Sequence, residues 1–164
     1  MTGKETEIEF EKRIREHRLL IYKVCRLYAY TDADRQDLFQ EIVIHLWKAY
    51  PSFQGLSQFS TWLYRVAINT AITGLRRQKH IIVSYEPGAL PSNQAEEVGS
   101  EEEQWHLLMS AIEKLNEIEK AIVMLYMEER TYEEMEAILG IGQGALRVKM
   151  SRIKDKLRKL TKNV

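Results

Sequence analysis

The chain has 164 residues, 45% of them hydrophobic, and its 24 basic and 24 acidic side chains give a formal net charge of zero. This length can bury a real core and also suffices for two small helical domains, while the balanced charge excludes a global positive field that would attract nucleic acid. No apolar run approaches the ~20 residues that a membrane helix needs.

The charges are distributed unevenly along the chain. Residues 1–80 carry 13 basic and 9 acidic side chains, residues 81–104 carry 0 and 6, and residues 105–164 carry 11 and 9. The segment 140–164 alone holds 8 basic residues and one acid. The neutral total therefore conceals an acidic joint and a basic C-terminal end.

Cysteine and histidine usage argues against disulfides and metals. The lone Cys25 cannot form an internal disulfide, and no charged start followed by an apolar stretch opens the chain. We therefore expect a reducing, cytoplasmic compartment, with Cys25 as a small core residue. The four histidines lie far apart in sequence, without a Cys or His at metal-ligand spacing, so we expect no metal and no cofactor.

Two helices are predicted in the first 50 residues. Apolar positions recur at helical spacing from Phe10 to Tyr30, which predicts one long amphipathic helix. A second helix starts near Thr31 or Asp34, either of which can cap free amides in its first turn, and ends at Pro51. Its buried side is expected to consist of Leu38, Ile42, Val43, Leu46 and Trp47.

A third helix is predicted over residues 59–79, after a loop marked by Gly55 and two serines. A Ser or Thr ahead of its inward positions is expected to cap this helix. The inward positions are Phe59, Leu63, Val66 and Thr70.

The segment 85–104 has the composition of a linker. It holds two of the three prolines of the chain, two glycines and no basic residue. Ser100 and Glu103 have the form of a capping box, so the next helix should begin near Glu101, and a shorter helix should follow over 117–129.

No strand pattern of useful length appears. We therefore expect an all-α fold of two small helical domains, 1–80 and 105–164, joined by a flexible acidic linker over 81–104.

The segment 131–160 has the pattern of a helix-turn-helix. Thr131 and Glu134 form a second capping box, and Gly140 ends the helix because glycine adopts a left-handed C-cap without steric cost. A second helix then places one apolar stripe inward, made of Leu146, Met150, Ile153, Leu157 and Leu160. Beside this stripe lie Arg147, Val148, Ser151 and Arg152, on a helix of the kind that enters a major groove.

A solvated amphipathic helix is the alternative for this stretch. Basic residues at a helix C-terminus also suit the macrodipole, and charged helical faces are usually just solvated. The tight turn and the position-specific pattern favour DNA binding. Within that interpretation, Arg147 and Arg152 can donate to guanine or phosphate, and Val148 can touch a thymine methyl. Lys149, Lys154 and Lys156 are expected to face phosphate or solvent.

The segment from Asp34 to Lys79 resembles region 2 of the sigma-70 family, in the form used by extracytoplasmic-function sigma factors. The C-terminal block resembles region 4 of that family, and the matches cover about residues 10–80 and 105–160. The first resemblance is carried by Asp37, Leu38, Phe39, Gln40, Glu41, Trp47, Phe53, Gly55, Thr61, Trp62, Leu63, Arg65, Ala67, Asn69, Arg76 and Arg77. Two ordered blocks at the right spacing are much more specific than a lone helix-turn-helix.

The resemblance implies a sigma factor, with core RNA polymerase and promoter DNA as partners. An acidic and apolar helix face would dock on a helix pair of the largest polymerase subunit. The implied residues are Asp37, Leu38, Gln40, Glu41 and Trp47. At least one of Leu38 and Trp47 is expected to pack in the core instead.

A second implied surface would capture a base flipped from the nontemplate strand of the minus 10 element and so help to separate the strands. Ser57, Gln58 and Asn69 would supply donors and acceptors, and basic residues would neutralise the backbone. The full set is Phe53, Ser57, Gln58, Arg65, Asn69, Arg76 and Arg77. The neighbouring Phe59, Trp62 and Leu63 are expected to pack rather than to contact bases.

The matching residues for reading the minus 35 element are Arg147, Val148, Ser151 and Arg152. The sequence departs from the family pattern at two nearby positions. Ala145 stands where Ser or Thr is common, which leaves Gly142 or Gly144 at the start of the helix. Glu136 stands where a small residue is usual.

The expected function is therefore a promoter-specificity subunit without catalytic activity or a small-molecule substrate. The resemblance also suggests an anti-sigma protein as a partner, often at the membrane. Two alternatives stay open. One is a helix-turn-helix regulator that does not replace a polymerase subunit, and the other is a helical adaptor that binds only proteins.

Overall fold

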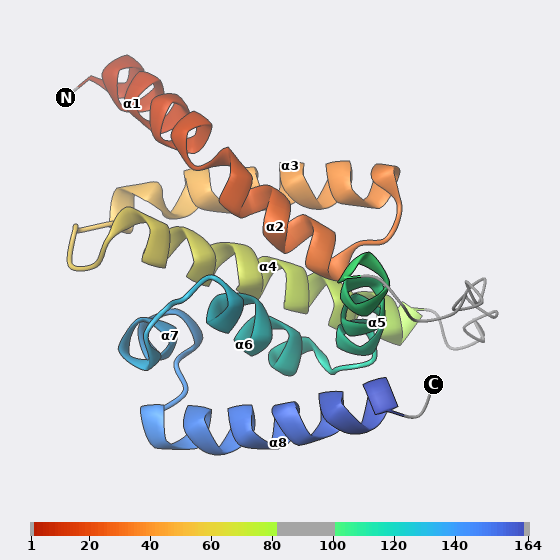
Figure 1. Cartoon of the computed structure of the whole chain (residues 1–164). Helices are drawn as coiled ribbons and strands as arrows, with labels where there is room; N and C mark the ends of the chain where they lie inside the picture. The colour runs from red at the N-terminus through yellow and green to blue at the C-terminus, as the bar shows by residue number, and fades with distance from the viewer. Residues whose placement is uncertain (1, 82–100, 163–164) are drawn as a thin grey trace. The chain divides into compact units, whose positions relative to one another are not determined.

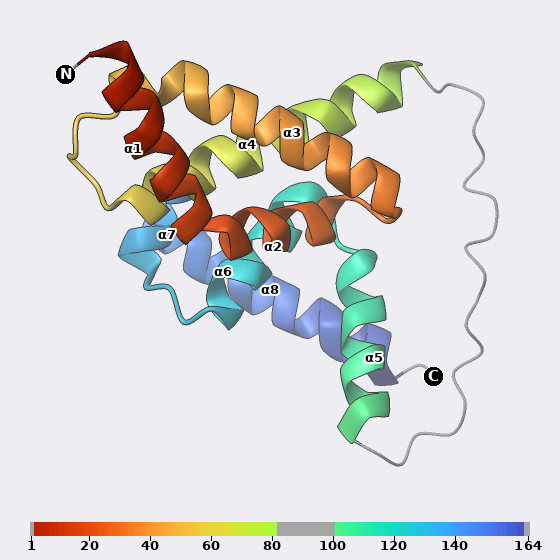
Figure 2. The same cartoon turned by 90° about the horizontal axis from the view of Figure 1, so that it is seen from above.

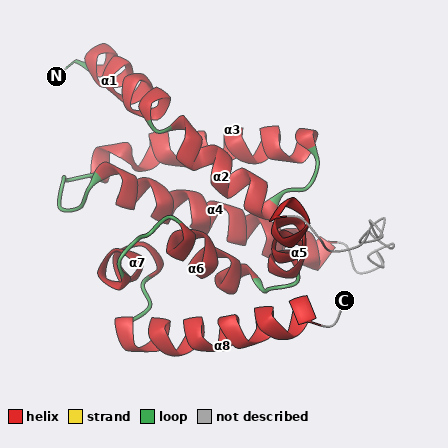
Figure 3. Ribbon diagram, viewed as in Figure 1, coloured by secondary structure: helices red, strands yellow, loops and turns green. Residues whose placement is uncertain are grey.

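The computed structural model describes residues 2–81 and 101–162, and the described residues are almost entirely helical. Helices and connecting loops account for them without a strand (Figure 3). This confirms the all-α prediction. The chain divides into two compact units, the first of residues 1–79 with 137–139 and the second of residues 80–136 and 140–164. Most of the predicted linker, and Ser100 of the predicted capping box, lie outside the described residues.

The first unit consists of four α-helices and one short 3-10 helix. Their bounds are α1 Gly3–Glu16, α2 Arg18–Tyr28, α3 Asp32–Ala49, η1 Tyr50–Ser52 and α4 Phe59–Ile81. Helix α2 packs along α3, and α1 leads into α2 (Figure 2). The buried apolar side chains of α2, α3 and α4 include Ile21, Val24, Ile42, Leu46, Leu63, Tyr64 and Ile68.

The prediction of one helix from Phe10 to Tyr30 is wrong, because the chain breaks at His17. The amide of His17 donates to the carbonyls of both Arg13 and Ile14, and its ring Nδ1 also lies 2.8 Å from the Arg13 oxygen. This local closure ends α1, and α2 then starts at Arg18 in a new direction (Figure 2). No glycine or proline marks the break in the sequence.

The two other helix starts in this unit differ in their caps. Thr31 is the cap of α3, since its hydroxyl accepts from the Asp34 amide at 3.1 Å. The predicted Ser or Thr cap of α4 is wrong. That helix starts at Phe59, directly after Gln58, whose carbonyl accepts the first helical bond from Trp62.

An aromatic cluster fixes the loop between η1 and α4. Its members are Phe10, Trp47, Tyr50, Phe53, Phe59 and Trp62, with neighbouring ring centroids 5.0–6.2 Å apart. The guanidinium of Arg13 lies 5.2 Å from the centre of the Phe59 ring, a cation–π contact. Both ends of the loop are therefore held by packing, while its middle is free to face outward.

Cys25 is buried in α2, as predicted. Burial raises the pKa of its thiol to about 11, against a smaller lowering by the Arg35 guanidinium. The thiol is therefore protonated at neutral pH, which suits a packing role rather than a reactive one.

The second unit contains α5 Glu101–Glu113, α6 Glu117–Met127, α8 Gln143–Lys162 and most of α7 Tyr132–Leu139. Helix α5 begins at the predicted residue, inside the range assigned to the linker. Helix α8 packs against α5 and α6 (Figure 1). Fully buried side chains of this unit include Ile122, Leu125, Met135, Leu146 and Ile153.

Only half of the predicted capping box at α7 forms. The Thr131 hydroxyl accepts from the Glu134 amide at 3.1 Å, but the Glu134 carboxylate binds the Arg130 guanidinium at 3.3 Å instead of returning to Thr131. At the other end Gly140 has φ 71°, so the predicted left-handed C-cap is confirmed.

Helix α6 ends in a Schellman motif with an unfavourable residue in it. The Arg130 amide donates to the Leu125 carbonyl and the Glu129 amide to the Tyr126 carbonyl. Glu129 consequently takes φ 61°, a left-handed conformation that costs a residue with a Cβ roughly 1–2 kcal/mol.

We therefore predict that Glu129→Gly stabilises the second unit by about 1 kcal/mol, because glycine adopts this conformation freely. The measurement is the shift in the denaturation midpoint followed by circular dichroism. Lys149→Gly, an exposed position inside α8, is the matched control and should destabilise by about 1 kcal/mol. A loss of stability in both variants would contradict the assigned strain.

Candidate functional site

Helix α8 presents two distinct faces. Leu146, Met150 and Ile153 are buried, and Leu157 and Leu160 are partly buried, as the stripe predicts. The candidate DNA-reading residues Arg147, Val148, Ser151 and Arg152 are all exposed. Val148 keeps 51% of its surface accessible and lies between the exposed Arg147 and Ser151. One side of α8 therefore holds the fold, and the other is available for recognition.

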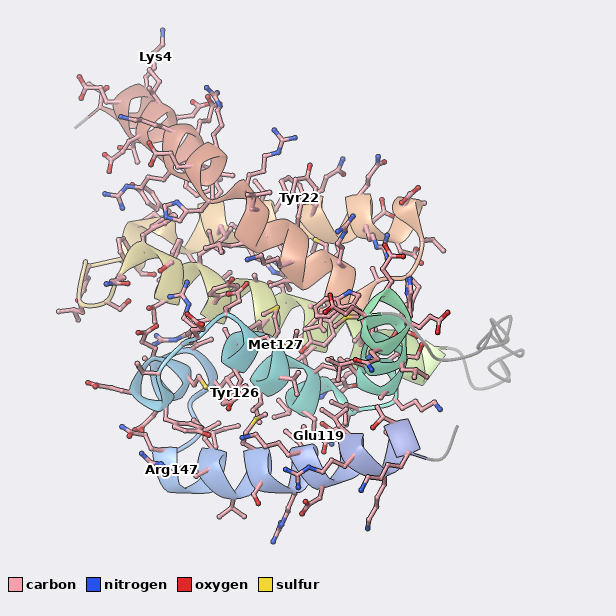
Figure 4. The ribbon with its side chains drawn as sticks, viewed as in Figure 1. Lys4, Tyr22, Glu119, Tyr126, Met127 and Arg147 are labelled. Atoms are coloured by element: carbon pink, nitrogen blue, oxygen red, sulfur yellow. The ribbon has the colours of Figure 1, made fainter. Side chains whose placement is uncertain are left out.

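The trailing lysines of α8 partly serve the fold. Lys154 donates to the Tyr126 hydroxyl at 3.2 Å and lies 4.8 Å from the centre of that ring. Lys156 forms an ion pair of 3.2 Å with Glu119. Figure 4 labels Glu119 and Tyr126 on the side of α8 that faces α6. These contacts direct both side chains toward α6, while Lys149 and Lys156 are exposed to solvent as predicted.

Polar and basic candidates lie along one side of α4. Arg65, Asn69 and Arg76 are four and seven residues apart, so the helical period brings them onto one face, and all three are exposed. Arg77 is also exposed, one position further round the helix. Trp62 and Leu63 are buried and Phe59 partly so, which confirms that they pack.

The loop before α4 combines fixed ends with an exposed tip. Phe53 is partly buried because its ring lies in the aromatic cluster, 5.1 Å from that of Trp62. The Ser57 hydroxyl donates to the Gln58 carbonyl at 3.3 Å, and the Gln58 side chain is exposed. The sequence reasoning did not consider Leu56, which is 90% exposed. The available signal was an apolar residue flanked by Gly55 and Ser57, away from the aromatic residues at the ends of the loop.

The candidate polymerase-binding residues lie on α3. Asp37 and Gln40 are exposed, Leu38 and Glu41 are partly buried, and Trp47 is 42% exposed although its ring contacts Phe10. Neither apolar candidate is a fully buried core residue, which corrects the expectation for Leu38 and Trp47.

Ile44 was missed by the sequence reasoning. It is 52% exposed and lies two helical turns after Asp37, in the middle of the same face. The predicted buried side of this helix had left it out. We define the α3 face as Asp37, Gln40, Glu41, Ile44 and Trp47.

A cavity of about 290 Å³ adjoins this face. Asp37, Leu38 and Glu41 line it, together with Tyr30 and Asp34 among others. Its rim is therefore acidic with apolar walls. Within the described parts of the chain, no group of three or more His, Cys, Asp or Glu side chains could hold a metal ion, and no helix is long and apolar enough to cross a membrane.

Two helical units, one of which carries an exposed basic helix after a tight left-handed turn, define an all-α protein of the helix-turn-helix class. Residues 13–81 match the family model of Sigma-70 region 2, and residues 105–157 match that of Sigma-70, region 4. The chain belongs to the sigma-70 family, in its extracytoplasmic-function (ECF) group.

Named relatives agree with this family. The chain is 31% identical over 135 residues to the ECF RNA polymerase sigma-E factor of Escherichia coli, covering 74% of this chain and 71% of that protein. It is 30% identical over 128 residues to the RNA polymerase sigma factor CarQ of Myxococcus xanthus, covering 76% and 73%.

A solved structure has the same fold. The sigma factor RpoE of Bartonella quintana, in complex with the anti-sigma factor NepR, superposes with a TM-score of 0.72 at 19% identity. The alignment covers 94% of this chain and 97% of that one.

Proposed function

We propose that this sigma factor divides promoter recognition between its two units. The exposed side of α8 reads the minus 35 element, and the loop before α4, with the exposed side of that helix, captures the minus 10 element. The observation that carries the proposal is the separation of α8 into a buried apolar stripe and an exposed face with Arg147, Val148 and Arg152. The two guanidinium groups can donate to guanine edges in a major groove, and the valine side chain can contact a thymine methyl group.

The minus 10 surface is proposed to act by holding an unstacked base. Base flipping costs a few kcal/mol, which contacts to the extruded base must offset. Gln58 and Asn69 offer exposed amides for base edges, while Arg65, Arg76 and Arg77 can neutralise the backbone. The role proposed for Phe53 is to anchor the loop through the aromatic cluster rather than to stack on the base, because its ring is already engaged.

The α3 face is proposed as the surface that binds core RNA polymerase. It combines the acidic Asp37 and Glu41 with the exposed apolar Ile44 and Trp47, a mixture suited to a partner helix pair with basic and apolar side chains. We place the protein in the cytoplasm, where the polymerase works, and propose that an anti-sigma protein regulates it. We assign it no catalytic step, since members of the family act as initiation factors.

The alternatives explain less. A helix-turn-helix regulator would account for α8 but not for the match of residues 13–81 to Sigma-70 region 2. An adaptor that binds only proteins would have no use for an exposed face with two arginines on α8.

The proposed function is tested by in vitro transcription. Core RNA polymerase with the chain should initiate at promoters that core polymerase alone ignores, and genome-wide mapping of transcript starts after overexpression should supply those promoters. Changing the minus 35 or the minus 10 element should each reduce initiation. Transcription that is the same with and without the chain would overturn the proposal.

A further inference from the structure

The start of α8 has no cap of its own. Its first helical bond runs from the Leu146 amide to the Gly142 carbonyl, so glycine occupies the N-cap position and has no side chain to offer. Ala145 in the first turn adds no acceptor either. The free amides of a first turn need partners, because an unsatisfied donor destabilises the helix end.

A residue of the preceding helix supplies that partner. The Glu136 carboxylate accepts from the Gln143 amide at 3.2 Å. A negative charge at this end also suits the helix macrodipole. The two departures from the family pattern, glutamate at 136 and alanine at 145, thus belong together: the acceptor missing from α8 is provided by α7.

One helical turn away, the same two helices meet again. The Arg147 guanidinium carbon lies 5.1 Å from the centre of the Tyr132 ring, a cation–π contact. Tyr132 and Glu136 are four residues apart on α7, and Gln143 and Arg147 are four residues apart on α8, so both contacts join one edge of each helix. Figure 4 labels Arg147 at the end of α8 nearest α7.

We propose that Tyr132 and Glu136 are positioning residues for promoter reading. Glu136 sets the residue at which α8 starts, and Tyr132 holds the Arg147 guanidinium in place before DNA arrives. Neither residue needs to touch the DNA. A fixed helix start and a guanidinium already held in place reduce the conformational entropy that is lost when DNA binds. The inference rests on the proposed role of α8 at the minus 35 element.

The test uses holoenzyme, formed from the full chain and core RNA polymerase, on a promoter identified by its transcript start. The readout is discrimination: the ratio of transcription from that promoter to transcription from the same promoter with one minus 35 base pair changed. Glu136→Ala should lower this ratio about 5-fold, whereas Glu136→Gln, which keeps an acceptor oxygen, should stay within 2-fold of the unmodified chain. Equal loss in both variants would overturn the capping role.

Tyr132 is tested by a double-mutant cycle. Tyr132→Ala should lower discrimination about 2- to 5-fold. Tyr132→Phe should keep the discrimination of the unmodified chain, because the ring face is retained. In chains that already carry Arg147→Ala, Tyr132→Ala should have no further effect, while its effect should be undiminished beside Arg152→Ala. A merely structural role would give the same effect in both backgrounds and would overturn the inference.

Two controls separate the possible failures. Circular dichroism identifies any variant that does not fold. If an alanine variant does not fold, the conservative variants Glu136→Gln and Tyr132→Phe still test whether discrimination is retained. Unmodified holoenzyme without minus 35 dependence would overturn the proposed function and this inference with it. If transcription depended on the minus 35 element but the effects of Tyr132→Ala and Arg147→Ala simply added, only the role of Tyr132 would be overturned.

Discussion

Leu146→Ala is expected to lower the stability of the second unit by about 2–5 kcal/mol and to abolish minus 35 recognition with it. Leu146 is fully buried in the first turns of α8, so truncation removes apolar contacts and leaves a cavity that the surrounding helices fill only partly. The measurement is amide hydrogen exchange in α6 and α8, which reports opening of this unit locally. Exchange unchanged from that of the unmodified chain would show that the inward face of α8 is wrongly assigned.

The matched variant on the same helix is Arg152→Ala. Its side chain is exposed, so stability should change by no more than ~0.5 kcal/mol. Minus 35 discrimination should nevertheless fall by about 1–3 kcal/mol if Arg152 contacts a base, or binding should weaken equally for all sequences if it contacts a phosphate. The two variants thus separate loss of fold from loss of recognition, and unchanged transcription with Arg152→Ala would remove this residue from the interface.

Features set by local chemistry could be predicted from the sequence. The inward stripe of α8 follows from the helical period, and the C-cap at Gly140 follows from the conformational freedom of glycine. The break at His17 could not be predicted, because it depends on a histidine ring and its own amide converging on one carbonyl in a segment without Gly or Pro. Helical periodicity continues across such a break and hides it.

Some of the exposed candidate residues could be predicted from the sequence and others could not. Exposure of Arg147 and Arg152 followed from their position outside the apolar stripe. Ile44 was left out of the predicted buried side of this helix but was not included among the docking candidates, and the structure shows it 52% exposed. The contact of Glu136 with the start of α8 could not be predicted from the sequence either, because it depends on how closely α7 and α8 approach each other.

The double charge reversal Asp37→Lys and Glu41→Lys is expected to weaken binding to core RNA polymerase by about 2–5 kcal/mol, roughly 30- to 4,000-fold. Asp37 is exposed and Glu41 partly buried, one helical turn apart on the α3 face. Replacing two acids by bases there converts attraction to a basic partner into repulsion. Competition with labelled, unmodified chain for core polymerase measures the loss, which should shrink as salt rises.

The matched control for that reversal is Glu7→Lys with Glu11→Lys. These two acids are exposed on α1 at the same four-residue spacing, so the variant changes the net charge of the chain equally while leaving the α3 face intact. Its affinity for core polymerase should remain within about 2-fold of that of the unmodified chain, because neither acid belongs to the α3 face and exposed charges outside a contact contribute little at physiological salt. If both double variants lost affinity to the same extent, the attraction would depend on overall charge, and α3 would lose its assignment as the docking face.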